Sequence, residues 1–165
     1  MFTSLTMMVV LGLGPEIGSH SLRWEHDYRQ ARSAAVSASK PLAVFVGAGA
    51  EGWRKVVHDC CLDADSQKTL AEKYVVVYVN QDTDAGRRIA ESFQLSGKDG
   101  LVISDRSGKV QAFRHEGDIT ASDLSQRLTR YADPAFVATT TESSTPLIHQ
   151  ANYVSPFRSS CPFCH

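Results

Sequence analysis

Two continuous apolar runs constrain the fold of this 165-residue chain more than any other feature of its sequence. Residues 42–46 read Leu-Ala-Val-Phe-Val and residues 74–79 read Tyr-Val-Val-Val-Tyr-Val. Both runs are rich in the β-branched and aromatic side chains that favour strands. Because neither alternates apolar with polar residues, both predict strands buried on two faces, as in a parallel sheet covered by helices. No apolar run in the chain approaches the roughly 18 residues that a membrane-spanning helix needs.

Helical patterns flank the two runs and separate them. Trp24, Tyr28, Ala31 and Ala35 share one face of a helix expected from Trp24 to Ser39, which the following Lys40-Pro41 would end. Residues 53–73 predict a helix at each end with an irregular middle near residues 59–65. A further helix is expected after Thr83 or Asp84, either of which can cap it.

The second half of the chain predicts a hairpin and a last helix. The segments 101–103 and 110–114 have strand patterns, and the residues Asp105-Arg-Ser-Gly108 between them favour a turn, so these two strands should be antiparallel. Thr120 and Asp123 have the spacing of a capping box at the start of a helix. Since strands separated by helices run parallel through right-handed crossovers, the order predicts an α/β fold with three layers, α/β/α, and a mixed central sheet.

Both ends of the chain differ from the middle. Residues 7–13 are apolar, and Ser19 and Ser21 are small, so residues 1–21 predict a cleavable leader or, since no Lys or Arg precedes the run, a disordered N-terminus. A leader favours an exported or periplasmic location over a cytoplasmic one. Residues 133–165 begin with a Ser/Thr-rich stretch and predict a flexible linker and tail. The folded domain is therefore expected at residues 22–132, and removal of residues 139–165 is expected to leave it stable.

Charge and composition exclude several function classes. The hydrophobic content of 42% and charged content of 21% are those of a globular chain. The net charge of −1 argues against a large basic surface for nucleic acid. Gly47, Gly49 and Gly52 have the spacing of a dinucleotide fingerprint, but no acidic residue follows at the required distance and no second half of such a fold is present, so nucleotide binding is not favoured. The isolated histidines His20, His26 and His115 are interpreted as surface residues.

Residues 22–132 resemble the thioredoxin-like superfamily. The resemblance is carried by the run Lys40-Pro-Leu-Ala-Val-Phe-Val46, by Trp53 and Lys55 in the next loop, by residues 74–82, and by Val102-Ile-Ser-Asp-Arg-Ser-Gly108. It implies the three-layer fold described above, with an active site just after the first central strand.

The resemblance also implies that the residues for thiol–disulfide exchange are missing from this active site. Thioredoxin-like oxidoreductases carry Cys-x-x-Cys at a helix N-terminus, where the thiol pKa is lowered, and a cis-proline opposite. This chain has Ala50-Glu-Gly-Trp53 at the first position and Asp99 at the second. The resemblance therefore implies a catalytically degenerate domain whose cleft, lined by Ala50, Trp53 and Asp99, binds a protein or peptide. For Trp53, packing beneath the first helix is an equal alternative to contact with a partner.

The four cysteines fall in two pairs outside that position. Cys60-Cys61 is interpreted as core packing, with a thiol sensor as the alternative. The pair in Cys161-Pro-Phe-Cys164-His165 has the spacing of a redox dithiol, of a c-type haem attachment site with His165 as axial ligand, and of half a zinc site. A fourth interpretation is an exposed tail that binds no ligand. We therefore expect the chain to carry no cofactor, with zinc or haem at the tail as the alternatives.

The leading hypothesis is a catalytically degenerate thioredoxin-like domain that serves as a protein- or peptide-binding module rather than an enzyme. The alternative is a thiol–disulfide redox protein using Cys161 and Cys164, or a metal-binding tail.

Overall fold

The two apolar runs form adjacent parallel strands, as predicted. The computed structural model describes residues 22–58, 61–95 and 97–144, and within these β2 (Leu42–Gly47) pairs in parallel with β3 (Val75–Asn80). The register places Phe45 opposite Tyr78. All six residues of β2 are buried, which is the pattern of a strand covered on both faces.

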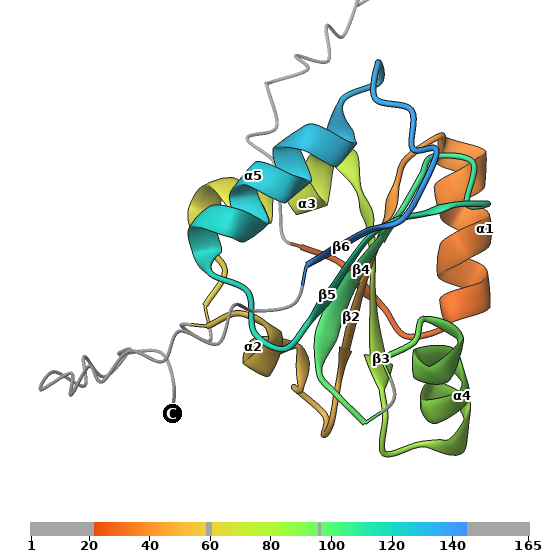
Figure 1. Cartoon of the computed structure of the whole chain (residues 1–165), viewed down its shortest axis with the longest axis vertical. Helices are drawn as coiled ribbons and strands as arrows, with labels where there is room; N and C mark the ends of the chain where they lie inside the picture. Colours follow the sequence, from red (N-terminus) through yellow and green to blue (C-terminus); the bar gives the residue numbers. More distant parts are fainter. Residues whose placement is uncertain (1–21, 59–60, 96, 145–165) are drawn as a thin grey trace, which may run out of the picture.

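The described part of the chain forms one mixed sheet in the order β1-β3-β2-β4-β5-β6 (Figure 1). Strand β4 (Gly100–Ser104) is antiparallel both to β2 and to β5 (Gln111–Glu116), so the predicted hairpin is confirmed. Asp105 closes its turn, because one carboxylate oxygen accepts hydrogen bonds from the backbone N–H of Lys109 and of Val110, each at 3.0 Å.

Helices cover both faces of the sheet, which gives the predicted three layers. On one face lie α1 (Tyr28–Ala38) and α4 (Asp84–Ser92); on the other lie α2 (Trp53–Val56), α3 (Ala64–Lys73) and α5 (Ala121–Ala132) (Figure 1). The break between α2 and α3 confirms the irregular middle expected within residues 53–73.

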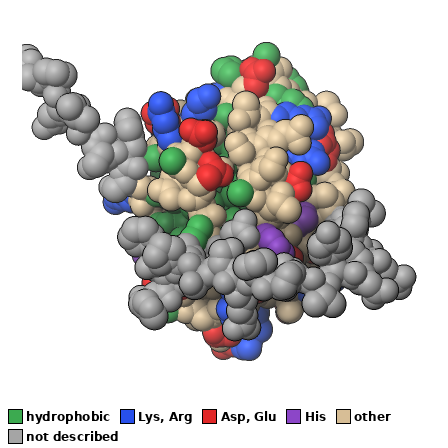
Figure 2. Space-filling model, turned by 90° about the vertical axis from the view of Figure 1, so that its left-hand side faces the viewer, with side chains coloured by type: hydrophobic (Ala, Val, Ile, Leu, Met, Phe, Trp, Pro, Cys, Tyr) green, Lys and Arg blue, Asp and Glu red, His purple; other side chains and the backbone are tan. Residues whose placement is uncertain are grey.

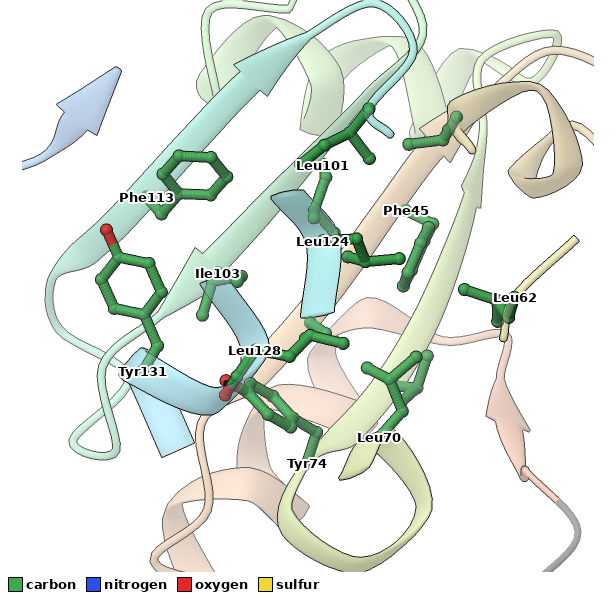
Figure 3. Packing of buried hydrophobic residues seen from close by; sticks show 14 of the residues in the cluster. Phe45, Leu62, Leu70, Tyr74, Leu101, Ile103, Phe113, Leu124, Leu128 and Tyr131 are labelled. Carbon is green, nitrogen blue, oxygen red and sulfur yellow. Dashed lines mark hydrogen bonds between the residues drawn. The ribbon is translucent and has the colours of Figure 1, made fainter. Parts of the chain in front are cut away.

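Side chains of the strands alternate between two cores, as the two-residue period of a strand requires. Phe45, Leu101, Ile103 and Phe113 pack against Leu124 and Leu128 of α5 and Leu70 of α3 (Figure 3). Val44, Val46, Val77 and Val102 point the other way, toward Ala31 and Ala35 of α1 and Ala90 of α4. Each buried Val, Leu, Ile or Phe side chain in these two cores stabilises the fold by roughly 1.5–3 kcal/mol. The hydroxyl of Tyr74, at the end of α3, donates to the carbonyl of Leu128 at 2.7 Å and so ties α3 to α5.

The prediction that the first helix begins at Trp24 is wrong. Trp24–Glu25 form the short strand β1, paired in parallel with Val76 and Val77 of β3, and the helix begins at Tyr28. Asp27 sets this start, because its carboxylate accepts a hydrogen bond from the backbone N–H of Gln30 at 2.9 Å. The helical spacing of Trp24 and Tyr28 is therefore a coincidence.

The segment after Asp133, for which a linker without secondary structure was predicted, contributes strand β6 (Glu142–Ser144), which runs parallel to β5. The sheet thus extends beyond residue 132, and removal of residues 139–165 would take a strand from it. The Ser/Thr-rich composition of this segment misleads because β6 is held by main-chain pairing with β5 and by the charged side chain of Glu142, and not by burial of apolar side chains. Glu142 accepts hydrogen bonds from Arg130 at 2.6 Å and from the Tyr131 hydroxyl at 2.8 Å.

His115 is also misread as a surface residue, since only 6% of it is exposed. Its Nε2 donates to the carbonyl of Asp118 at 2.9 Å, which leaves Nδ1 to accept from the Ser144 hydroxyl at 2.9 Å. His115 therefore helps to fasten β6 to β5. Within the described residues, no helix combines the length and the apolar character that a membrane span requires.

We expect Glu142→Ala to lower the free energy of unfolding by about 1 kcal/mol, because Arg130 and Tyr131 lose a charged partner that is only partly exposed. In a domain of this size that is about 4–8 °C in Tm. The variant should also lower the pKa of Tyr131, which burial first and the Glu142 hydrogen bond second raise to about 12.

The pH dependence follows from that raised value. A tyrosine whose folded pKa lies above its unfolded pKa of about 10 contributes stability that is complete below pH 10 and is lost as the pH rises toward 12. Thermal melts from pH 7 to 11 test this, with the exposed Thr140→Ala as control. Equal melting curves for Glu142→Ala and Thr140→Ala would show that β6 is not held as described.

Candidate functional site

The loop after β2, residues 48–52, lies at the carboxyl ends of the parallel strands β2 and β3. Residues at the end of β3 hold it in place. The Tyr78 hydroxyl donates to the carbonyl of Gly49 at 2.6 Å, and the backbone N–H of Gly49 donates to Asp82 at 2.8 Å and to the Asn80 side chain at 3.2 Å. Crevices outside the carboxyl ends of parallel strands are where ligands bind in open α/β sheets.

The glycines of this loop have a packing reason. A Cβ on Gly52 would lie 2.4 Å from both the carbonyl oxygen of Ala48 and the Tyr78 hydroxyl, and Gly49 has φ of +90°, which disfavours other residues. The tight conformation of the loop thus explains these glycines, as it does in many unrelated turns. Nucleotide binding is not required to explain their spacing.

Burial raises the pKa of the Tyr78 hydroxyl. A hydrogen bond with the backbone at Gly52 opposes this increase, while the nearby carboxylates of Asp99 and Asp82 add to it. Tyr78 is therefore a neutral hydrogen-bond donor at ordinary pH, and it acts on the loop rather than on a proton in solution.

Helix α2, which follows the loop, is a single turn. Gly52 is its N-cap and makes no side-chain capping bond, and the helix ends at Val56. The sequence resemblance predicts that Ala50 and Trp53 stand where thioredoxin-like oxidoreductases have cysteines. Ala50 is exposed, and Trp53 is the first residue of α2. Neither side chain has an atom that can act as a nucleophile.

Trp53 is half-buried and packs against β1. Its ring centroid lies 4.9 Å from that of Trp24, and Trp24 in turn meets the edge of Phe45 at 5.2 Å. This aromatic row joins α2 to the core, so part of the Trp53 ring is structural, although its neighbour is β1 and not the first helix. A contact between its remaining surface and a partner stays a prediction.

Asp99 occupies the turn before β4, opposite the loop. The backbone here is closed by internal hydrogen bonds: the carbonyl of Asp99 accepts from the N–H of Gly117 at 2.7 Å, and the carbonyl of Lys98 accepts from the Gln81 side chain at 2.8 Å. No peptide bond among the described residues is cis. Gln81 is a residue that sequence reasoning missed, because only the tertiary fold brings it beside Lys98.

Two residues of the predicted cleft, Ala50 and Asp99, border different cavities. Ala50 borders a cavity of about 410 Å³ with Tyr78, Asn80 and Ile89. Asp99 borders another of about 280 Å³, together with Ala48 and Asp82. Trp53 lines neither of these two.

The first cysteine pair lies between α2 and α3. Cys61 is half-buried, while Cys60 lies outside the described residues. His58 precedes the pair; its backbone N–H donates to the carbonyl of Ile119 at 2.9 Å, and its Nδ1 donates to Asp118 at 2.5 Å. That side-chain hydrogen bond is the main reason that the pKa of Asp118 is lowered. The sequence gives no sign that His58 and Asp118 interact, since the two residues lie far apart in the chain.

The tail residues Cys161, Cys164 and His165 lie outside the part of the chain that the structure describes. In residues 22–58, 61–95 and 97–144, no three His, Cys, Asp or Glu side chains are grouped to hold a metal ion.

Comparison with known proteins finds solved structures that share this fold. No family model matches the sequence, and no curated protein matches it. A solved thioredoxin from Thermus thermophilus superposes with a TM-score of 0.54 at 20% identity, covering 66% of this chain and 85% of that one. A structure described as DsbH oxidoreductase gives a TM-score of 0.51 at 18% identity, covering 74% of this chain and 93% of its own. At these identities the similarity concerns the fold alone, and it confirms the predicted α/β, thioredoxin-like architecture.

We expect Gly52→Ala to destabilise the domain by about 1–3 kcal/mol, because the added methyl group would overlap the Ala48 carbonyl and the Tyr78 hydroxyl. Chemical denaturation measures the loss. The matched control is Ala50→Ser in the same loop, where the side chain is exposed and stability should not change. If both variants unfold at the same denaturant concentration, the close approach at Gly52 is not present in solution.

Proposed function

We propose that this chain is a catalytically degenerate thioredoxin-like domain that acts as a protein- or peptide-binding module through the loop at residues 48–52. The proposal is supported by one observation above all: the loop is held firmly by Tyr78 and Asp82, yet contains no cysteine. An ordered surface without a thiol is suited to recognition rather than to thiol–disulfide exchange.

The residue types at the two cysteine positions support the same conclusion. Ala50 offers only a methyl group and borders a cavity. Trp53 offers an indole ring, and exposed parts of such rings are frequent in binding interfaces. A module of this kind needs only that the partner fit the loop and its cavity.

Binding through the loop can be tested with a random dodecapeptide display library selected on the full chain. We expect peptides to be recovered whose affinity falls at least 10-fold in Ala50→Arg, because the long side chain would fill the cavity of about 410 Å³ beside Tyr78 and Asn80. Ala135→Arg, an equally exposed position beyond α5, is the matched control and should bind as the unmodified chain does. Failure to recover any peptide, or equal binding by both variants, would contradict the proposed function.

The lack of thiol exchange can be tested by restoring the cysteines. In a background that keeps the four native cysteines, Ala50→Cys combined with Trp53→Cys should reduce insulin faster than Ala50→Ser combined with Trp53→Ser. The reason is that α2 begins directly at this loop and lowers the pKa of a thiol placed there, although a single turn does so less than a long helix.

The unmodified chain should reduce insulin no faster than a variant with Cys161→Ser and Cys164→Ser. A clear loss of activity in that variant would instead support the redox alternative at the tail. A folded but inert double-cysteine variant would contradict the assignment of Ala50 and Trp53 to the cysteine positions.

A further inference from the structure

A groove lies between the two helices on the face away from α3 and α5. The α1–α4 groove has a volume of about 980 Å³, and its apolar lining includes Tyr28, Val36 and Ile89. Val36 is 46% exposed, which is unusual for a large apolar side chain on this domain. Tyr28 and Ile89 also border the cavity beside Ala50, so the groove leads toward the loop after β2.

Three arginines border this groove: Arg29 and Arg32 of α1 and Arg88 of α4. None of them pairs with a carboxylate of the described residues. Arg32 donates from two guanidinium nitrogens to the carbonyl of Gly108, at 2.8 and 3.1 Å, so its charge is not neutralised. Asp27, the one acidic residue in the lining, is occupied in capping α1. The groove therefore carries a local excess of positive charge on a chain whose net charge is −1.

Two arginines on the opposite face, by contrast, pair with a carboxylate. There, acidic and basic side chains lie next to one another (Figure 2). Two arginines of α5, Arg127 and Arg130, are both paired with Glu142 of β6, at 3.5 and 2.6 Å. Arg127 and Arg130 thus have a carboxylate partner within the domain, whereas no ion pair of the described residues involves Arg29, Arg32 or Arg88.

We propose that the α1–α4 groove binds an acidic segment of a partner protein, in which Asp or Glu residues flank an apolar side chain. This inference rests on the proposed function and names the chemistry of the partner. The planar guanidinium groups suit carboxylates, with which they form paired hydrogen bonds, and the lining of Tyr28, Val36 and Ile89 suits the apolar side chain between them.

A peptide fits the groove better than a nucleic acid does. Single-stranded nucleic acids need aromatic faces for stacking as well as positive charge. The lining of this groove contains two aromatic rings, His26 and Tyr28, and Tyr28 already meets Phe93 edge to face, with centroids 5.6 Å apart. The apolar side chains of Val36 and Ile89 offer nothing to a base edge or a phosphate.

The test uses the full chain and the random dodecapeptide library. We expect the selected peptides to be enriched in Asp and Glu around an apolar residue, and their affinity, measured by fluorescence polarisation, to fall as salt is raised. The double variant Arg29→Gln/Arg88→Gln should bind at least 10-fold more weakly. All three arginines are exposed, but Arg32 is left unchanged because its guanidinium donates hydrogen bonds to the hairpin turn.

Lys68→Gln/Lys73→Gln is the matched control, because it removes the same charge from exposed positions of α3 on the other face and should leave affinity unchanged. Amide chemical shifts of Ser33, Val36 and Ala85 should move on titration with a selected acidic peptide, which places the peptide in the groove.

Several outcomes would overturn the inference. Selected peptides whose binding depends on Ala50 could lack acidic enrichment or could bind the Arg29→Gln/Arg88→Gln variant normally. Either result would contradict the inference of an acidic partner but would leave the proposed function standing. Recovery of no peptide at all would remove both. A dT15 oligonucleotide that binds through Arg29 and Arg88 more tightly than the acidic peptides would assign the groove to nucleic acid instead.

Discussion

The parallel pairing of β2 with β3 is the interaction on which the rest of the structure depends. These two strands are buried on both faces, and their alternating side chains supply both cores at once. Each helix layer needs this central pair to bury its own apolar stripe. The antiparallel β4 and β5 then extend the sheet on the side of β2, and β1 completes it on the side of β3.

The same pairing positions the candidate site. Because β2 and β3 run in the same direction, their carboxyl ends meet at one edge, and residues that follow β3 can hold the loop that follows β2. Tyr78, Asn80 and Asp82 do so through hydrogen bonds to Gly49. Residues 48–53, which form this loop and the first residue of α2, contain no cysteine. The α1–α4 groove lies beside the loop, and its three arginines are the basis for the acidic partner proposed above.

Much of the fold could be predicted because its signals are local. The composition of residues 42–46 and 74–79 predicts buried strands. The turn residues at 105–108 predict a hairpin, and the spacing of Thr120 and Asp123 predicts the start of a helix. All three were confirmed. That residues 48–53 contain no cysteine can likewise be read directly, since the absence of a side-chain type from a segment is a property of the sequence and needs no coordinates.

The errors and omissions arose where a residue's state is set by a partner far away in the chain. Trp24 follows a helical spacing but pairs with β3, and residues 142–144 have the composition of a linker but pair with β5, where Glu142 meets Arg130 and Tyr131. The separation of Ala50 and Asp99 into different cavities and the gathering of Arg29, Arg32 and Arg88 around one groove were likewise decided by the packing of α1 and α4 on the sheet. The sequence by itself determined which segments must be buried, because burial follows from side-chain hydrophobicity and its period. Only the tertiary structure decided which polar and charged groups meet, because hydrogen bonds and charge pairing act over a few ångströms between atoms that the chain order does not bring together.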